Sequence, residues 1–205
     1  EAVAITEDGG IIPTTSVGNS ASFAIFAEKV IVEINTNLSP AFEGLHDIYI
    51  PTYRPTRQPI PLTQVDERIG THAINIDPAK IVGIVINNDL HDSPSTVTAP
   101  DDETQGIADH LIAFFEKEVA EERLPKNLGP LQAGIGSIAN AVLTGLKDSN
   151  FEDLVMYSEV LQDCTFELID AGKMKFASGS SITLSAKYGE KVFNNLEAYK
   201  DKLVL

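Results

Sequence analysis

The sequence predicts an α/β fold, with a parallel sheet covered by helices and with parts of two α/β domains. Three observations lead to this prediction. Hydrophobic residues make up 43% of the 205 residues, enough to bury a sizeable core. From residue 103 onward, short β-branched segments alternate with segments of helical periodicity. A glycine turn at residues 134–136 stands between one predicted strand and the next predicted helix. Such alternation is typical of parallel sheets whose faces are covered by helices.

The composition changes along the chain and suggests three parts. Residues 1–88 are β-rich and are expected to be the C-terminal part of a first domain. Residues 89–102 are rich in Asn, Asp, Ser, Thr and Pro, which is typical of a linker. Residues 103–205 are expected to be the N-terminal part of a second domain. Because the chain has no initiator Met and ends abruptly at Leu205, we expect a middle fragment of a longer protein.

The first part is predicted to contain three strands, at residues 2–5, 29–34 and 80–86, because each is a short apolar segment rich in β-branched residues. A long stretch between the second and third strands contains Pro51, Pro55, Pro59 and Pro61. Proline fixes φ and has no amide donor, so we expect an ordered loop with few ladder hydrogen bonds.

In the second part, residues 103–122 have apolar side chains at helical spacing, with acidic side chains on the other face. After residue 130, segments with a strand pattern alternate with segments of helical periodicity. Strands are predicted at residues 131–135, 154–157 and 174–177, and further helices at residues 137–146, 160–169 and 187–202.

The charge and cysteine content exclude several classes of function. The net charge of −15 repels phosphate backbones, so nucleic-acid binding is not expected. No apolar run approaches the roughly 20 residues of a membrane span. The N-terminus has no secretory signal, and the single cysteine, Cys164, rules out an intramolecular disulfide. These features favour a cytoplasmic protein.

The glycine turn and a following acid form the main candidate site. Gly134, Gly136 and Ala139 fit a GxGxxA dinucleotide fingerprint, and Glu159 follows Ala139 by 20 residues, where a ribose-binding acid belongs. A nicotinamide-dependent oxidoreductase is therefore one alternative. A second interpretation is that both glycines only allow close packing of helix and strand. A third is a non-catalytic module, which the isolated fragment could be. Ser137 is expected to cap the helix, and Glu159 alone could equally be a solvated surface acid.

Two segments carry a family resemblance, residues 134–142 (GIGSIANAV) and residues 157–163 (YSEVLQD). With residues 33–37 (EINTN), 42–49 (FEGLHDIY) and 68–70 (RIG), they resemble the acetyl-CoA hydrolase/transferase family, and most of all its succinyl-CoA:acetate CoA-transferases. The similarity spans essentially the whole chain. It implies a CoA-transferase-like fold.

The resemblance also implies a reaction. Glu159 would attack an acyl-CoA thioester and pass through a covalent glutamyl-CoA thioester, and water in place of the acceptor acid would give hydrolysis. The residues implied to bind CoA are Gly134, Ile135, Gly136, Ser137 and Ile138. CoA would be a substrate, with acetate or succinate as acceptor and with no tightly bound cofactor or metal. A homodimer stays open as an alternative. Other family segments would lie beyond Leu205, so the fragment alone is expected to be inactive.

Other polar residues are given structural interpretations. Histidine–aspartate pairs at His46–Asp47, His91–Asp92 and Asp109–His110 suggest a metal site, but ordinary surface histidines are expected instead. The arginines of the proline-rich stretch, Arg54, Arg57 and Arg68, are candidates for an anion such as the CoA phosphates or for loop ion pairs. The spacing of Cys164 along the predicted helix favours core packing.

Overall fold

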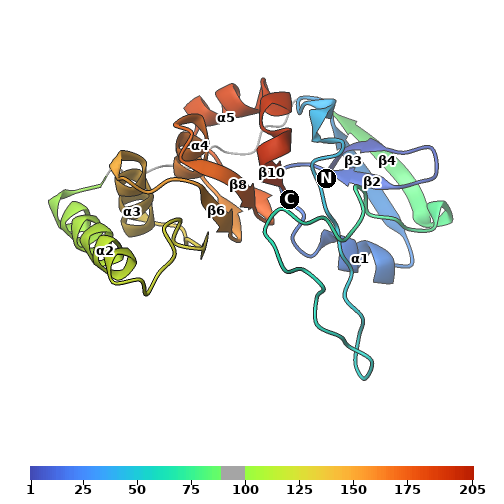
Figure 1. The fold of residues 1–205 in the computed structure, drawn as a ribbon. Coiled ribbons are helices and arrows are strands. Elements are labelled where there is room, and N and C mark those ends of the chain that lie inside the picture. Colours follow the sequence, from blue (N-terminus) through green and yellow to red (C-terminus); the bar gives the residue numbers. More distant parts are fainter. Residues whose placement is uncertain (89–99) are drawn as a thin grey trace. The chain divides into compact units, whose positions relative to one another are not determined.

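The computed structural model describes residues 1–88 and 100–205, and contacts divide these into two units (Figure 1). One unit contains residues 1–88 together with residues 190–205, and the other contains residues 100–189. The last residues of the chain therefore group with the first unit, whereas the sequence suggested a continuous domain over residues 103–205. His91 and Asp92 lie outside the described residues.

The first unit is built on a four-stranded sheet in the order β2-β1-β3-β4. Its strands are β1 (Ala2–Ile5), β2 (Ile11–Pro13), β3 (Val30–Asn35) and β4 (Ile81–Asn87). β1 pairs with β2 antiparallel, whereas β1 with β3 and β3 with β4 are parallel. All three predicted strands are present within one residue of the expected bounds. β2 and helix α1 (Ser20–Phe26) were not predicted.

One face of this sheet forms the core of the first unit. Successive residues of a strand point to opposite faces, so Val32 is 4% exposed while its neighbour Ile31 is 69% exposed. The buried apolar side chains of this core come from strands, from α1 and from two loop segments: Ala2, Ile11, Ala21, Val32, Ile48 and Ile74.

Irregular backbone connects β3 to β4. Short 3-10 turns occur at Pro40–Phe42 and Pro78–Lys80, and the proline-rich residues 51–61 contain no helix or strand, as expected. Two segments of this connection are held together by the carboxylate of Asp47, which accepts hydrogen bonds from the amides of Ile69 (2.9 Å) and Gly70 (2.7 Å). An antiparallel bridge between Ile48 and Thr71 continues this contact.

His46 lies within the same connection and is fully buried, so the expectation of a surface histidine was wrong. Its Nε2 atom lies 3.1 Å from the carbonyl oxygen of Thr14, which can only accept, so Nε2 carries the proton of the neutral ring. Nδ1 has no hydrogen-bond partner within the described residues. Burial lowers the pKa of His46 to about 4, because a charged imidazolium loses its hydration there.

The second unit contains two sets of parallel strands. β5 (Pro130–Leu131) pairs with β6 (Leu154–Tyr157), and β6 pairs with β8 (Met174–Ser178). β7 (Val160–Leu161) pairs with β9 (Ser181–Ile182). Its helices are α2 (Asp102–Ala120), α3 (Ser137–Asp148) and α4 (Asp163–Asp170), and α2 lies beside α3 (Figure 1). Parallel strands alternating with helices confirm the predicted α/β class.

Three predicted elements of this part have different bounds. The strand expected at residues 131–135 contains only Pro130–Leu131, because the glycine turn leaves the sheet early. The helix expected at residues 160–169 begins at Asp163, since Val160–Leu161 pairs as β7. The helix expected at residues 187–202 is α5 (Ala186–Phe193), which ends before two asparagines and is followed by 3-10 turns at Leu196–Ala198 and Lys200–Lys202. Asparagine is a weak helix former, which accounts for this end.

We expect Gly70→Ala to destabilise the first unit. A Cβ atom at position 70 would lie 2.2 Å from the carbonyl oxygen of Ile48 and 2.7 Å from the amide nitrogen of Tyr49, and backbone atoms cannot rotate away. Overpacking of this kind costs about 1–3 kcal/mol, so urea unfolding should shift to lower denaturant. Gly106→Ala is the matched control, because a Cβ there meets no atom within 4 Å. An unchanged midpoint for the Gly70 variant would contradict the close approach.

We expect stability to fall as the pH drops from about 6.5 to about 4, in part because of His46. The folded-state pKa of about 4 lies below the ordinary value of 6.5, so the unfolded chain binds the proton first. This contribution to the free energy of unfolding is complete above pH 6.5 and amounts to at most about 3–4 kcal/mol. His46→Gln should flatten the plot of unfolding free energy against pH, measured by urea titration. His110→Gln on the exposed face of α2 should leave the slope unchanged. Equal slopes for both variants would refute the attribution of this pH dependence to His46.

Candidate functional site

The glycine turn follows β5 and leads directly into α3. Gly136 is the N-cap residue of α3, with φ +143°, a region that favours glycine. Ser137 is the first helical residue and does not cap the helix, so that expectation was wrong. The four amides of the first helical turn have no partners inside the helix, and the positive end of the helix dipole lies at this turn.

The turn is open to solvent. Gly134, Ile135 and Gly136 are exposed, Ile135 at 74%, and Ile138 is 48% exposed. A Cβ atom at Gly134 or at Gly136 would meet no atom within 4 Å. The packing interpretation of the two glycines was therefore wrong, because neither lies against a neighbouring element. Their missing side chains leave room for another molecule to approach the backbone.

Glu159 lies where the chain leaves β6 and enters β7. Its side chain is exposed, and its carboxylate has no ion pair within the described residues. Its backbone is held firmly: the carbonyl oxygen accepts hydrogen bonds from the amide (2.8 Å) and the hydroxyl (3.0 Å) of Ser180. The result is an acid with a fixed backbone and a free carboxylate.

Strand pairing brings the turn and Glu159 to the same edge of the sheet. β5 and β6 are parallel, with Pro130 opposite Val155 and Leu131 opposite Met156, an offset of 25 residues. The same offset relates Gly134 to Glu159. Ligands bind at this carboxyl edge in open α/β sheets.

Two side chains that the sequence reasoning missed connect these segments. The hydroxyl of Ser158 donates to the carbonyl oxygen of Ala133 (3.0 Å), and the amide of Gln162 donates to the carbonyl oxygen of Gly134 (3.3 Å). Both residues lie within the YSEVLQD segment, so their nearness to Glu159 was visible, but nothing in the spacing indicated their partners. The structure thus brings the predicted turn and the predicted acid together.

Cys164 is a core residue, as expected. It is 6% exposed, and its Sγ atom lies 3.6 Å from Oδ1 of Asn140 on α3. Burial raises the pKa of the thiol to about 11, so the thiolate needed for nucleophilic chemistry is strongly disfavoured.

The remaining candidates lie apart from this arrangement. Arg54 and Arg57 are exposed in the proline-rich loop, whereas Arg68 donates to the carbonyl oxygens of Leu45, His46 and Leu203. Arg68 therefore braces backbone rather than facing an anion. Among residues 1–88 and 100–205, no three His, Cys, Asp or Glu side chains come close enough together to hold a metal ion. None of the helices there has the length and apolar character needed to cross a bilayer.

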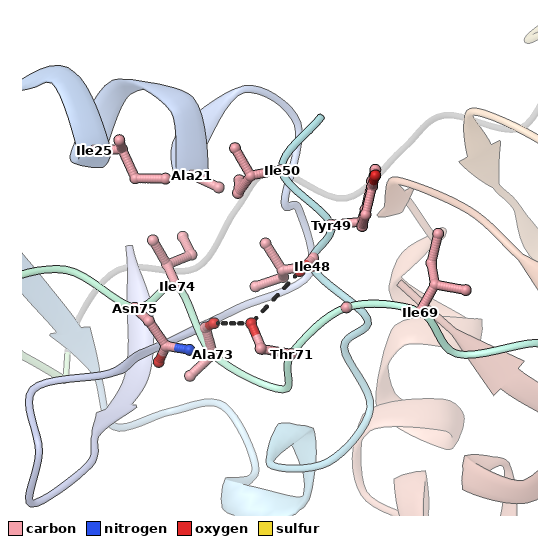
Figure 2. A pocket seen from close by; sticks show the side chains of 11 residues that line it. Ala21, Ile25, Ile48, Tyr49, Ile50, Ile69, Thr71, Ala73, Ile74 and Asn75 are labelled. Carbon is pink, nitrogen blue, oxygen red and sulfur yellow. Dashed lines mark hydrogen bonds between the residues drawn. The ribbon is translucent and has the colours of Figure 1, made fainter. Parts of the chain in front are cut away.

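The first unit contains a cavity of about 310 Å³ (Figure 2). Its walls are mostly aliphatic, and Ile48, Ile50 and Ile74 point into it. The polar side chains of its lining belong to Tyr49, Thr71 and Asn75, and the Thr71 hydroxyl donates to the carbonyl oxygen of Ala73 (2.8 Å). No charged side chain lines this cavity, so it offers no charge to pair with a carboxylate or a phosphate.

Comparison with known proteins gives consistent results. A family model described as the acetyl-CoA hydrolase/transferase N-terminal domain matches residues 1–86. Acetyl-CoA hydrolases of Schizosaccharomyces pombe and Saccharomyces cerevisiae are 48% and 44% identical over 205 residues, 100% of this chain. The chain spans 39% of the length of each of these relatives.

Solved structures confirm the fold. RipA from Yersinia pestis has a TM-score of 0.60 at 18% identity, over 94% of this chain and 37% of its own. A 4-hydroxybutyrate CoA-transferase from Porphyromonas gingivalis has a TM-score of 0.56 at 19% identity, over 94% of this chain and 41% of its own. At this identity the likeness concerns the fold alone. The family-model match to residues 1–86 and the relatives' identity over the full chain show that the chain is similar to proteins of the acetyl-CoA hydrolase/transferase family.

Proposed function

We propose that this protein transfers CoA between an acyl-CoA and a short carboxylic acid, with Glu159 as the nucleophile. The observation that carries the proposal is the direct hydrogen bonding between the Glu159 segment and the glycine turn, through Ser158 and Gln162. These bonds connect the segment that carries Glu159 to the exposed backbone of the turn. The relatives' name, acetyl-CoA hydrolase, supports acetyl-CoA as the donor.

The reaction has two exchanges at the same carboxylate. An oxygen of Glu159 attacks the thioester carbonyl, the carbon–sulfur bond breaks, and CoA leaves as a thiolate while an acyl-glutamyl anhydride forms. The thiolate then attacks the glutamyl carbonyl and releases the first acid as a carboxylate. An incoming carboxylate reverses these steps and leaves as the new acyl-CoA. Water attacking an acyl intermediate gives net hydrolysis instead.

The geometry of the turn suits the CoA side of this reaction. We propose that CoA is bound by Gly134, Ile135, Gly136, Ser137 and Ile138. Backbone at the glycines is open to close approach, and the amino end of α3 favours negative charge. The exposed side chains of Ile135 and Ile138 offer apolar contact to the uncharged arm of the cofactor.

The same proposal covers the setting of the reaction. Acetate or succinate is the acceptor, CoA is a substrate and not a bound cofactor, and the reaction belongs to acetate metabolism in the cytoplasm. A single cysteine suits a reducing compartment. The similarity to this family favours CoA chemistry over a nicotinamide cofactor at the same turn, although the GxGxxA spacing fits both.

We expect Glu159→Gln, in the full-length polypeptide that carries this sequence, to abolish CoA exchange, since an amide is a poor nucleophile. The assay incubates the protein with acetyl-CoA and measures exchange, then reduces with borohydride and locates the modified residue by mass spectrometry. Wild-type protein should be modified at Glu159. Glu116→Gln, on the exposed face of α2, should behave as wild type.

An unchanged exchange rate for Glu159→Gln would refute the mechanism. Binding of NADH by the wild-type protein without any covalent adduct would favour the oxidoreductase alternative.

Residues 1–205 alone are expected to give no turnover and no borohydride-sensitive adduct. The chain spans 39% of its relatives, and oxyanion donors of the kind that complete such a site contribute about 10²–10³-fold in rate. The same assay applied to the purified chain tests this expectation, with full-length protein as the positive control. Robust turnover by residues 1–205 would contradict it.

A further inference from the structure

The positions of Ser158 and Gln162 raise a question that the proposed reaction leaves open. A nucleophile must be held near the groups that stabilise its transition state, and a displacement of about 1 Å can cost 10²-fold in rate. The glycine turn has little packing of its own, because Ile135 is 74% exposed and both glycines face open space. Something other than packing must therefore set its distance from Glu159.

Ser158 supplies one such connection. Ala133 and Ser158 have the same offset of 25 residues as the regular β5–β6 pairs. They lie two residues beyond the last of these pairs, Leu131 with Met156. There the Ser158 hydroxyl donates to the Ala133 carbonyl oxygen at 3.0 Å and lies 3.4 Å from the Ala133 amide, which donates to it. A side chain thus takes over the pairing where the backbone ladder has ended.

Gln162 supplies a second connection, one residue further along the turn. Its side chain is buried, with the residue 6% exposed, and its Nε2 atom donates to the carbonyl oxygen of Gly134 at 3.3 Å. A buried amide without a partner costs about 1–3 kcal/mol, so this contact is favoured over an unpaired state. Gln162 also precedes α4, which ties it to the rigid part of the unit.

The Glu159 segment is anchored on its other side as well. The amide of Ser158 donates to the carbonyl oxygen of Ser178 (2.9 Å), and the carbonyl oxygen of Glu159 accepts from Ser180 and from Ser181 (3.2 Å). Ser158 and Gln162 therefore connect the turn to a backbone that is already fixed, so they can transmit a defined position.

We propose that Ser158 and Gln162 are positioning residues that fix the glycine turn against Glu159, so that the carboxylate and the turn amides act on one thioester. This proposal rests on the proposed function for its catalytic consequence. Its structural part, restraint of the turn by the two side chains, stands by itself. Neither side chain needs to touch the substrate.

The structural part is tested by hydrogen exchange at the amide of Ala133, which donates to the Ser158 hydroxyl, in the chain itself, followed by NMR. Ser158→Ala and Gln162→Leu should each raise exchange at this amide about 10-fold, without comparable change in the strands β6 and β8. Ser158→Thr keeps the hydroxyl and should restore protection. If Gln162→Leu does not fold, Gln162→Asn, which shortens the side chain by one methylene, replaces it.

Matched controls exist in the same unit. Ser149 makes the same kind of contact, donating to the Leu146 carbonyl oxygen (2.7 Å) and accepting from the Phe151 amide (3.2 Å), but at the end of α3. Ser149→Ala should leave exchange at the turn unchanged. Gln105→Leu, which loses an exposed contact to Asp109 on α2, should do the same. Unchanged exchange in the Ser158 and Gln162 variants would overturn the proposal.

The catalytic part is tested by steady-state kinetics of the full-length polypeptide. Ser158→Ala and Gln162→Leu should lower kcat about 10- to 100-fold while KM for acetyl-CoA changes less than about 3-fold, and Ser158→Thr should recover most of kcat. Unchanged kcat would overturn the catalytic role. If the wild-type protein shows no exchange activity, the proposed function fails, whereas faster amide exchange at the turn would still establish the restraint.

Discussion

The parallel pairing of β5 with β6 is the constraint on which the candidate site depends. Only two residue pairs define it, Pro130 with Val155 and Leu131 with Met156. A shift of one residue would turn every side chain of the strand to the other face and separate the turn from its acid. So short a strand holds its register poorly by backbone bonds alone. The Ser158 side chain extends the same register to Ala133, which makes the pairing longer than the ladder shows.

Glu159 is exposed because of a break between two sets of strands. β6 ends at Tyr157, and β7 begins at Val160 with a different partner, β9. Between them the chain needs residues whose backbone is bonded but whose side chains are not packed. Ser180 satisfies the carbonyl oxygen of Glu159 with two donors, so the backbone is ordered while the carboxylate stays in solvent. Order of this kind separates the residue from an ordinary mobile surface acid.

Patterns that depend on neighbouring residues were predicted from the sequence, and patterns that depend on distant partners were not. The apolar runs of β1 and β6 have the predicted bounds, and the glycine turn and Glu159 are visible in the local sequence. The burial of His46 could not be foreseen, since it depends on Thr14, 32 residues away. The partner of Ser158 is 25 residues away, and only the strand register determines it. Val160–Leu161 forms a strand only by pairing with β9, and local sequence does not reveal that partner. The helix was therefore predicted to begin too early, at residue 160.

The glycines of the chain show how a fold requirement differs from a site requirement. Gly70 is required by the fold, since a Cβ atom there would lie 2.2 Å from a backbone oxygen. Gly136 is required by its φ of +143°. Gly134 has neither a close neighbour nor a positive φ, so a larger residue would fit without strain. A side chain at position 134 would extend into open space. A glycine there leaves the backbone open to the approach of another molecule, which the proposed binding of CoA at this turn would use.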